Sequence, residues 1–346
     1  MKKIFLLAGV MILVTGCNDN EQVPAVKEEI PGKQTESESE ENHLFLIKEN
    51  GKYGFINQKG EKVIPAAFDW ADGFYEGLAC VETGGKIGFI NKKGQMVIRP
   101  QFEDAGNFSG GLAWIKKGGK VGYVDKNGRT VIRPQFDEAR AFSNGLAEVS
   151  INYKWGYVDK NGNTVIKMQY EGTGPFKEGL ANVLRDIGQK WEYINRKGET
   201  LFGTGFDGAG EFSEGLAMVS VGEKRGFIDK TGKTVIAPAF EMASAFREGL
   251  AVVKKNGKWG FIDKNGRTVI PFRFDMAHSF HQGLASVSVD GKWGFITPDG
   301  QFKIKAQYDA VGDFNNGLAE FYKDNYRGYI DTEGRTVYKS LFDDDE

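Results

Sequence analysis

One position of this sequence changes its chemistry from copy to copy of a recurring motif. It follows each Leu-Ala pair, and its occupants are Cys80, Trp114, Glu148, Asn182, Met218, Val252, Ser286 and Glu320. Since alternate side chains of a strand face opposite ways, this variable column should project away from the surface formed by its apolar neighbours. Extended surfaces of repeat proteins are where partners usually bind. We therefore predict partner binding along the variable column, with a solvent-facing column that is free to vary as the alternative.

Large or polar side chains are the most informative members of such a surface. The candidate binding residues are Trp70, which lies outside the column, and Trp114, Glu148, Asn182 and Met218 within it. Tryptophan is enriched in binding hot spots, and a solvent-facing ring lowers solubility unless a partner covers it. Such rings serve protein partners and glycans alike, so both classes of partner stay open.

The sequence contains no arrangement of residues typical of catalysis or metal binding. The Asp-x-Asn-Gly turns at Asp125, Asp159 and Asp263 match calcium loops only in part, because no glutamate follows at the twelfth position. His278 and His281 share one loop, but no cysteine or carboxylate cluster completes a ligand set. No Gly-x-Ser-x-Gly motif or phosphate-binding loop occurs. We therefore expect no catalytic residue, no metal site and no cofactor, and we predict that the protein is not an enzyme.

A tandem repeat positions these residues. One glycine recurs at a period of about 34 residues, slightly longer across the fifth unit, at Gly54, Gly88, Gly122, Gly156, Gly226, Gly260, Gly294 and Gly328. A second motif, Phe-x-x-Gly-Leu-Ala, recurs eight times in the same frame between Phe74 and Phe314. Two motifs with one period define nine units. In the fifth unit Glu192 replaces the glycine and a hairpin tip is two residues longer, which indicates either a ligand site or simple degeneracy.

Residues 250–270 show what one unit should form. Two β-rich runs flank Asn256-Gly257, which is a strong hairpin signal. The second run ends in Asp263-Lys264-Asn265-Gly266, typical of a type I turn closed by a left-handed residue. A third run follows, so each unit reads as a three-stranded meander plus a loop of about a dozen residues. The lysine and acid columns, such as Lys258 and Asp275, we interpret as structural pairs rather than as ladders for a partner.

The repeated letters resemble those of a known family. KWGYVD at 154–159, KWGFID at 258–263 and KWGFI at 292–296 are similar to the WG repeat family of bacteria, also called KWG repeats. The resemblance covers residues 44–346, although Trp occupies its column only at Trp155, Trp191, Trp259 and Trp293. It implies an all-β repeat module, frequent on secreted or envelope proteins, without defined catalytic residues.

The way in which the nine units assemble is the main open point of the fold. We expect an all-β open, twisted array of three-stranded β-meander repeats. The alternative is a closed β-propeller, for which nine blades are many and the repeated unit is short for a four-stranded blade. An open array would suit a family whose members vary in unit number.

The first residues have the layout of a bacterial lipoprotein signal. Lys2 and Lys3 precede an apolar run that ends in Val14-Thr15-Gly16-Cys17, which resembles a lipobox. We expect cleavage before Cys17 and lipidation of its thiol, which would hold the protein on a membrane surface. The predicted organisation is a signal peptide over 1–16, the lipidated cysteine and a disordered acidic tether over 17–43, and a repeat domain over 44–346.

The distribution of charge along the sequence argues against nucleic acid as the partner. Residues 18–43 hold eight acidic and two basic side chains, which leaves the repeat region near +2. Such a balance is unlike that of a nucleic-acid-binding protein. We predict a monomeric, membrane-anchored lipoprotein of the cell envelope whose repeats bind or scaffold an envelope or extracellular protein. The alternative is a surface lipoprotein that binds or processes glycan or peptidoglycan.

Overall fold

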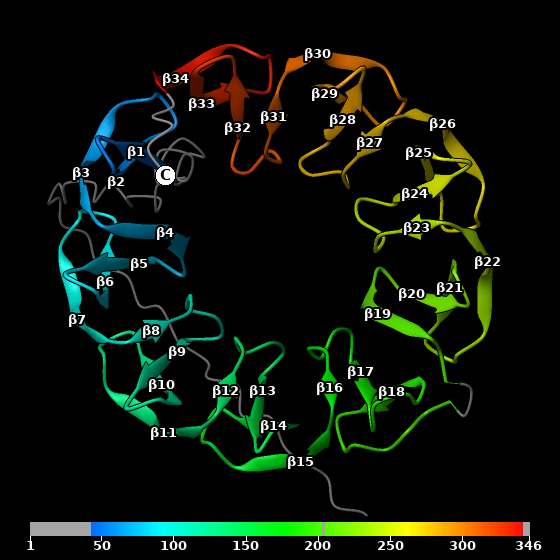
Figure 1. Ribbon diagram of the computed structural model, residues 1–346, viewed down its shortest axis with the longest axis horizontal. Helices are drawn as coiled ribbons and strands as arrows, with labels where there is room; N and C mark the ends of the chain where they lie inside the picture. The colour runs from blue at the N-terminus through cyan, green and yellow to red at the C-terminus, as the bar shows by residue number, and fades with distance from the viewer. Residues whose placement is uncertain (1–42, 203–204, 342–346) are drawn as a thin grey trace, which may run out of the picture. The chain divides into compact units, whose positions relative to one another are not determined.

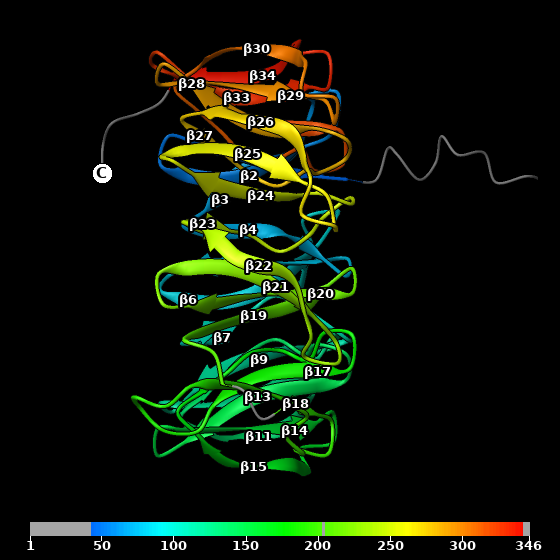
Figure 2. The same cartoon turned by 90° about the vertical axis from the view of Figure 1, so that its right-hand side faces the viewer.

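The repeats form a closed ring of nine antiparallel sheets (Figure 1). The computed structural model describes residues 43–202 and 205–341, so the predicted signal peptide, Cys17 and almost all of the tether lie outside the described residues. The expected open array is wrong, and the alternative, a β-propeller, is confirmed with nine blades. Seen edge-on, the strands run across the thickness of the ring (Figure 2).

Each sheet is one blade, numbered here in chain order. Blades 1 to 3 contain β1 (Phe45–Glu49), β2 (Lys52–Ile56), β3 (Lys62–Phe68); β4 (Trp70–Tyr75), β5 (Leu78–Thr83), β6 (Lys86–Asn91), β7 (Met96–Phe102); and β8 (Asp104–Ala105), β9 (Leu112–Lys117), β10 (Lys120–Asp125), β11 (Thr130–Phe136). Blades 4 to 6 contain β12 (Glu138–Ala139), β13 (Leu146–Ile151), β14 (Lys154–Asp159), β15 (Thr164–Tyr170); β16 (Gly172–Thr173), β17 (Leu180–Leu184), β18 (Trp191–Asn195); and β19 (Gly208–Ser213), β20 (Leu216–Val221), β21 (Lys224–Asp229), β22 (Thr234–Phe240). Blades 7 to 9 contain β23 (Met242–Ala243), β24 (Ala251–Lys255), β25 (Lys258–Ile262), β26 (Thr268–Phe274); β27 (Met276–Ala277), β28 (Ala285–Val289), β29 (Lys292–Ile296), β30 (Phe302–Tyr308); and β31 (Ala310–Val311), β32 (Leu318–Lys323), β33 (Tyr326–Asp331), β34 (Thr336–Leu341).

Most blades have a fourth, innermost strand, which the expected meander lacks. In blade 7 this strand is β23, whose two residues pair with β24 as Met242↔Lys254 and Ala243↔Val253. It is formed by the segment that the sequence suggested was a loop. Such a short strand shows no alternation of polar and apolar side chains, and it lets one repeated unit supply all four strands of a blade.

The core is divided among the interfaces between neighbouring blades. At one of them Leu216, Phe227 and Ile236 of blade 6 pack against Phe246 and Val253 of blade 7. The rings of Phe227 and Phe246 are 4.8 Å apart, and the corresponding aromatic pairs recur around the ring. Phe246, in the loop of its unit, therefore fastens one unit to the next. Because a three- or four-stranded blade buries little alone, these interfaces supply the stability.

The last blade meets the first through contacts like those between internal blades. Phe45 and Ile47 share a buried cluster with Leu318 and Tyr329. The amide of Gln58 donates to the carbonyl of Asn316 at 2.6 Å. Lys126 and Arg196, at the same turn position, donate to the carbonyls of Glu76 and Asn144. Among the described residues the ring therefore closes by side-chain packing and hydrogen bonds, since the first and last blades share no strand there.

The recurring turns have the predicted geometry. Gly266 has φ of +79°, and the Asp263 carboxylate accepts from the backbone N–H groups of Asn265 and Arg267 at 2.9 and 2.8 Å. A Cβ at Gly266 would also lie 3.2 Å from the Ile236 side chain of the preceding blade. The turn glycine therefore serves both a left-handed backbone and a close contact between blades.

The glycine after the Trp column is required for a different reason. A Cβ at Gly88 would lie 2.5 Å from the carbonyl oxygen of Ile98 and 2.7 Å from the nitrogen of Pro100, because the bulged strand β7 crosses directly above it. Glu192 has a side chain at this position, and blade 5 has only isolated bridges in place of the outer strand among the described residues. The Glu192 carboxylate instead accepts from Arg185 Nε at 3.1 Å and Thr200 Oγ1 at 3.0 Å. The missing outer strand of blade 5 thus coincides with the loss of this glycine, whereas the longer hairpin tip does not depend on it.

The charged columns link consecutive blades, as the structural interpretation predicts. Lys258 Nζ lies 2.6 Å from Asp275 Oδ1, while the other oxygen of Asp275 accepts from the Asp290 backbone N–H at 2.7 Å. The hydrogen bond from Lys258 lowers the pKa of Asp275. Since these groups are exposed to solvent, each pair contributes little to stability.

Candidate binding site at the inner rim

Six of the eight members of the variable column lie opposite one residue of the bend that follows the innermost strand of their blade. The backbone N–H of this bend residue donates to the carbonyl of the column residue eight positions later. The pairs are Gly106 with Trp114, Arg140 with Glu148, Gly174 with Asn182, Ser244 with Val252, His278 with Ser286 and Gly312 with Glu320. We call these segments the inner bends, and they are the elements that sequence reasoning overlooked.

The variable column is not a solvent-facing stripe. Glu148 is 2% exposed and Asn182 7%, whereas Trp114 and Met218 are half-buried. Glu148 accepts from Thr173 Oγ1 at 3.0 Å, and Asn182 Nδ2 donates to the Ala209 carbonyl at 2.9 Å, both in the following blade. The expected exposure is wrong because both faces of a blade pack against neighbours in the ring. A binding role for these residues stays a prediction.

The residue type in the variable column changes together with the residue of the inner bend that faces it. A Cβ at Gly106 would collide with the Trp114 indole, and one at Gly174 would collide with the Asn182 amide. Glu148, by contrast, faces Arg140 and forms an ion pair with it. Residues eight positions apart therefore complement each other in size or charge. This spacing was visible in the sequence and gives the variation a structural cause.

The partial burial of Trp114 has a measurable effect on stability. Its indole packs against the core between blades 3 and 4, so Trp114→Ala should lower the free energy of unfolding by about 2 kcal/mol, below the range for a fully buried ring. Trp70, 39% exposed at the start of β4, is the matched control, and its replacement by alanine should change stability by less than about 0.5 kcal/mol. Urea unfolding of both variants tests the difference, and equal midpoints would contradict the assignment of Trp114 to the core.

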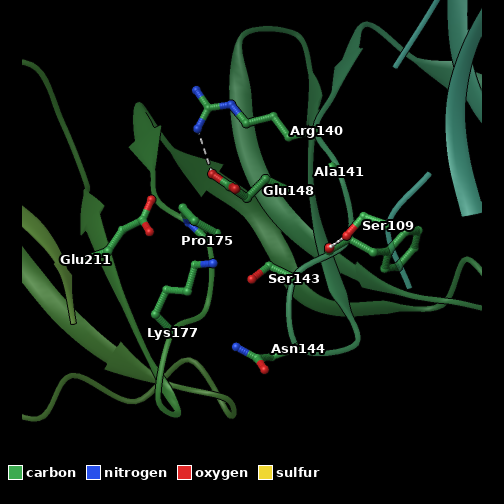
Figure 3. A pocket seen from close by; sticks show the side chains of 10 residues that line it. Ser109, Arg140, Ala141, Ser143, Asn144, Glu148, Pro175, Lys177 and Glu211 are labelled. Atoms are coloured by element: carbon green, nitrogen blue, oxygen red, sulfur yellow. Dashed lines mark hydrogen bonds and ion pairs between the residues drawn. The ribbon is translucent and has the colours of Figure 1, made fainter. Parts of the chain in front are cut away.

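A cavity of about 640 Å³ opens beside one of these pairs, between blades 4, 5 and 6 (Figure 3). Arg140 and Glu148 of blade 4 lie on one side. Lys177, from the inner bend of blade 5, and Glu211 of β19 lie on the other. Of the predicted residues, only Glu148 lines this cavity; Trp70, Trp114, Asn182 and Met218 do not.

The ion pair is held rigidly. Arg140 Nη1 donates to Glu148 Oε1 at 2.7 Å and to the Thr173 carbonyl at 2.9 Å, and its guanidinium lies 4.6 Å from the centre of the Trp155 ring. The Glu148 side chain is 3% exposed, whereas that of Arg140 is 51% exposed. Burial raises the pKa of the Glu148 carboxyl, while Arg140 and Thr173 oppose this rise. The open face of the guanidinium remains available to a ligand in the cavity.

The facing wall carries charges that the fold does not use. Within residues 43–202 and 205–341, the side chains of Lys177 and Glu211 form no hydrogen bond or ion pair. With Arg140 they offer donors and an acceptor, of both signs, to one cavity. In the same ranges no cluster of three or more His, Cys, Asp or Glu is placed to hold a metal ion. The arrangement suits binding of a polar ligand.

Comparison with protein families gives two matches. The model of the WG containing repeat matches eight segments, residues 53–86, 87–120, 122–155, 155–191, 193–224, 226–259, 259–293 and 293–326. The model of the prokaryotic membrane lipoprotein lipid attachment site matches residues 1–18. No curated protein matches the sequence. No helix in the described part of the chain is long and apolar enough to cross a membrane.

Several solved structures are similar to the chain at low sequence identity. A eukaryotic initiation factor is 11% identical, with a TM-score of 0.62 over 87% of this chain and 96% of that one. PorZ, a surface component of the type-IX secretion system of Porphyromonas gingivalis, is 9% identical, with a TM-score of 0.35 over 86% of this chain and 50% of that one. Virginiamycin B lyase from Staphylococcus aureus is 12% identical, with a TM-score of 0.34 over 76% and 94%. At such identity the likeness to the initiation factor concerns the fold alone.

Proposed function

The chain belongs to the WG-containing repeat family and carries a lipoprotein attachment site, and from this premise we propose that its propeller is a protein-binding scaffold of the bacterial envelope. The lipid anchor holds the propeller at a membrane surface, and the propeller binds its partner there. The cavity between blades 4 and 6 receives a charged segment of that partner. The protein acts as a monomer and performs no chemistry on what it binds.

The unused charges at this cavity are the observation that carries the proposal. Lys177 and Glu211 are unpaired within the described residues, and half of the Arg140 side chain is open. A polypeptide segment supplies backbone donors and acceptors together with side chains of either sign, so it can satisfy all three. The volume of about 640 Å³ lies within the roughly 300–1,000 Å³ of ligand pockets. Arginine is also enriched among the residues that dominate protein interfaces.

The position of Glu148 favours binding over catalysis. A general acid or base must reach the proton that it transfers. The Glu148 carboxylate is instead occupied by Arg140 and Thr173, and only 3% of its side chain is exposed. Its role is to fix the direction of the guanidinium, which presents its open side to the partner.

Site-specific photo-crosslinking tests the proposal. A benzoylphenylalanine placed at Lys177, in cells that produce the anchored protein, should give a discrete polypeptide adduct. The same group at Lys233, exposed on a turn of blade 6, should not. Glu211→Lys removes the acceptor without disturbing a contact of the fold, and it should reduce the adduct at least fivefold. Equal adducts from both positions, or an adduct unaffected by Glu211→Lys, would refute the assignment.

A further inference from the structure

Four blades have a tryptophan on the third strand. The blades differ in whether a side chain of the inner bend covers this ring. In blade 4 the Arg140 guanidinium covers Trp155 at 4.6 Å from the ring centre. In blade 8 the His278 imidazole stacks on Trp293, with ring centres 4.9 Å apart and planes inclined by 23°. The corresponding bend residue of blade 7 is Ser244, whose side chain is too short to cover Trp259. Here a cavity of about 590 Å³, lined by both residues, takes the place of the missing cover.

Part of the lining of this cavity is apolar. Trp259, Met242 and Val252 line it. In blades 4 and 8 the covering group rests on a polar partner, with Arg140 bonded to Glu148 at 2.7 Å and His278 to Ser286 at 2.9 Å. The equivalent residue below Ser244 is Val252, which is 3% exposed and whose side chain offers no hydrogen bond. A ligand that takes the place of the cover must therefore present an apolar face. Lys254, next to Trp259 across the β24–β25 ladder, does not line the cavity.

The rim is polar and carries both signs of charge. Arg247 Nη1 lies 2.6 Å from His281 Nε2, and this nitrogen lies 3.3 Å from Asp313 Oδ2. The hydroxyl oxygens of Ser244 and Ser279 are 3.1 Å apart and also face the cavity. Arg247, His281 and Asp313 line an adjoining cavity of about 550 Å³ as well. The site thus extends past one ring-sized group in a line of polar side chains.

We propose that this cavity binds a pyranose residue of a glycan. The C–H groups of one sugar face carry partial positive charge, which suits the negative face of the Trp259 indole. The hydroxyl groups at the edge of the ring both donate and accept hydrogen bonds, as Asp313, Arg247 and the serines require. A second sugar unit reaches the adjoining cavity along the shared rim. An aromatic side chain of a peptide would use the apolar part of the lining but would form fewer hydrogen bonds with the rim, whose side chains already contact one another.

Comparison of equivalent positions in the repeats suggests a substitution that tests the proposal. Ser244→Arg places in blade 7 the residue that covers Trp155 in blade 4, so it should fill the cavity and leave Trp259 in place. The probes are defined hexasaccharides of glucose, N-acetylglucosamine and mannose, glycan strands freed from peptidoglycan, and N-acetyltryptophanamide as a peptide mimic. Binding is followed by isothermal titration calorimetry and by intrinsic tryptophan fluorescence. Thermal melting confirms that each variant is folded.

We expect saturable binding of at least one saccharide, weakened at least tenfold by Ser244→Arg and by Asp313→Asn, and unchanged by Trp191→Ala in blade 5. Failure of every saccharide to bind, or binding that survives Ser244→Arg, overturns the proposal. Binding of N-acetyltryptophanamide without any saccharide assigns the cavity to a peptide and also overturns it. Neither Ser244→Arg nor Asp313→Asn touches the cavity of Lys177, so the crosslinking test and this one can fail separately.

Discussion

Gly88→Ala should unfold at much lower urea concentration than Gly85→Ala, although the two glycines lie in the same hairpin. A Cβ at Gly88 would meet the β7 backbone at 2.5 Å from the Ile98 oxygen and 2.7 Å from the Pro100 nitrogen. Backbone atoms of a packed strand cannot move aside as a flexible side chain can. We therefore expect a loss of about 3 kcal/mol, at the upper end of overpacking effects.

Gly85 provides the control because only its backbone conformation is at issue. It has φ of +70°, and a Cβ there would have no neighbour within 4 Å. Alanine should lose about 1 kcal/mol in the left-handed region, part of it recovered through the reduced freedom of the unfolded chain. Equilibrium urea unfolding followed by tryptophan fluorescence compares the two variants. Losses of equal size would mean that strand β7 does not press on Gly88 as the structure shows.

The recurring glycines also show which features of the fold could be predicted from the sequence. The constant period, the turns and the strands of the repeats could be predicted, because Gly266 and its neighbours have strong local preferences. Closure could not, since it depends on the angle between neighbouring blades, to which many side chains contribute slightly. The innermost strands could not either. The Met242–Ala243 strand is too short to show any alternation of polar and apolar residues.

Only one part of the candidate site, the pair of Arg140 and Glu148, has a signal in the sequence. Glu148 belongs to a column whose variation marks it in the sequence, and its partner Arg140 stands a fixed eight residues earlier. Lys177 lies in the inner bend of blade 5 and Glu211 in the bulged strand β19 of blade 6, and only the curvature of the ring brings them to one cavity. The variable column suggested a surface, whereas the structure shows paired residues at blade interfaces, with cavities where a pair leaves space.

Ring closure should make Phe45 more important to the integrity of the ring than an equally buried internal phenylalanine. Phe45 is 8% exposed, and its ring centre lies 5.5 Å from that of Tyr329 in the last blade. Phe280 is 1% exposed and lies 5.1 Å from Phe261 at an internal interface. Replacing either phenylalanine by alanine should lower the free energy of unfolding by about 3 kcal/mol or more. The two variants should nevertheless lose stability in different ways.

The difference arises because the chain joins blades 7 and 8. Within residues 43–341, by contrast, blades 9 and 1 meet through packing and hydrogen bonds, such as the 2.7 Å bond from Tyr329 Oη to the Leu46 carbonyl. Phe45→Ala should therefore open the seam before global unfolding, and hydrogen exchange of β1 and β34 should accelerate at least tenfold at low urea. Phe280→Ala should accelerate exchange at its own interface and leave β1 and β34 protected. Small-angle scattering of Phe45→Ala should show a larger radius of gyration as the ring opens. Protection of β1 and β34 that equals the wild type in Phe45→Ala would mean that the seam does not depend on this packing.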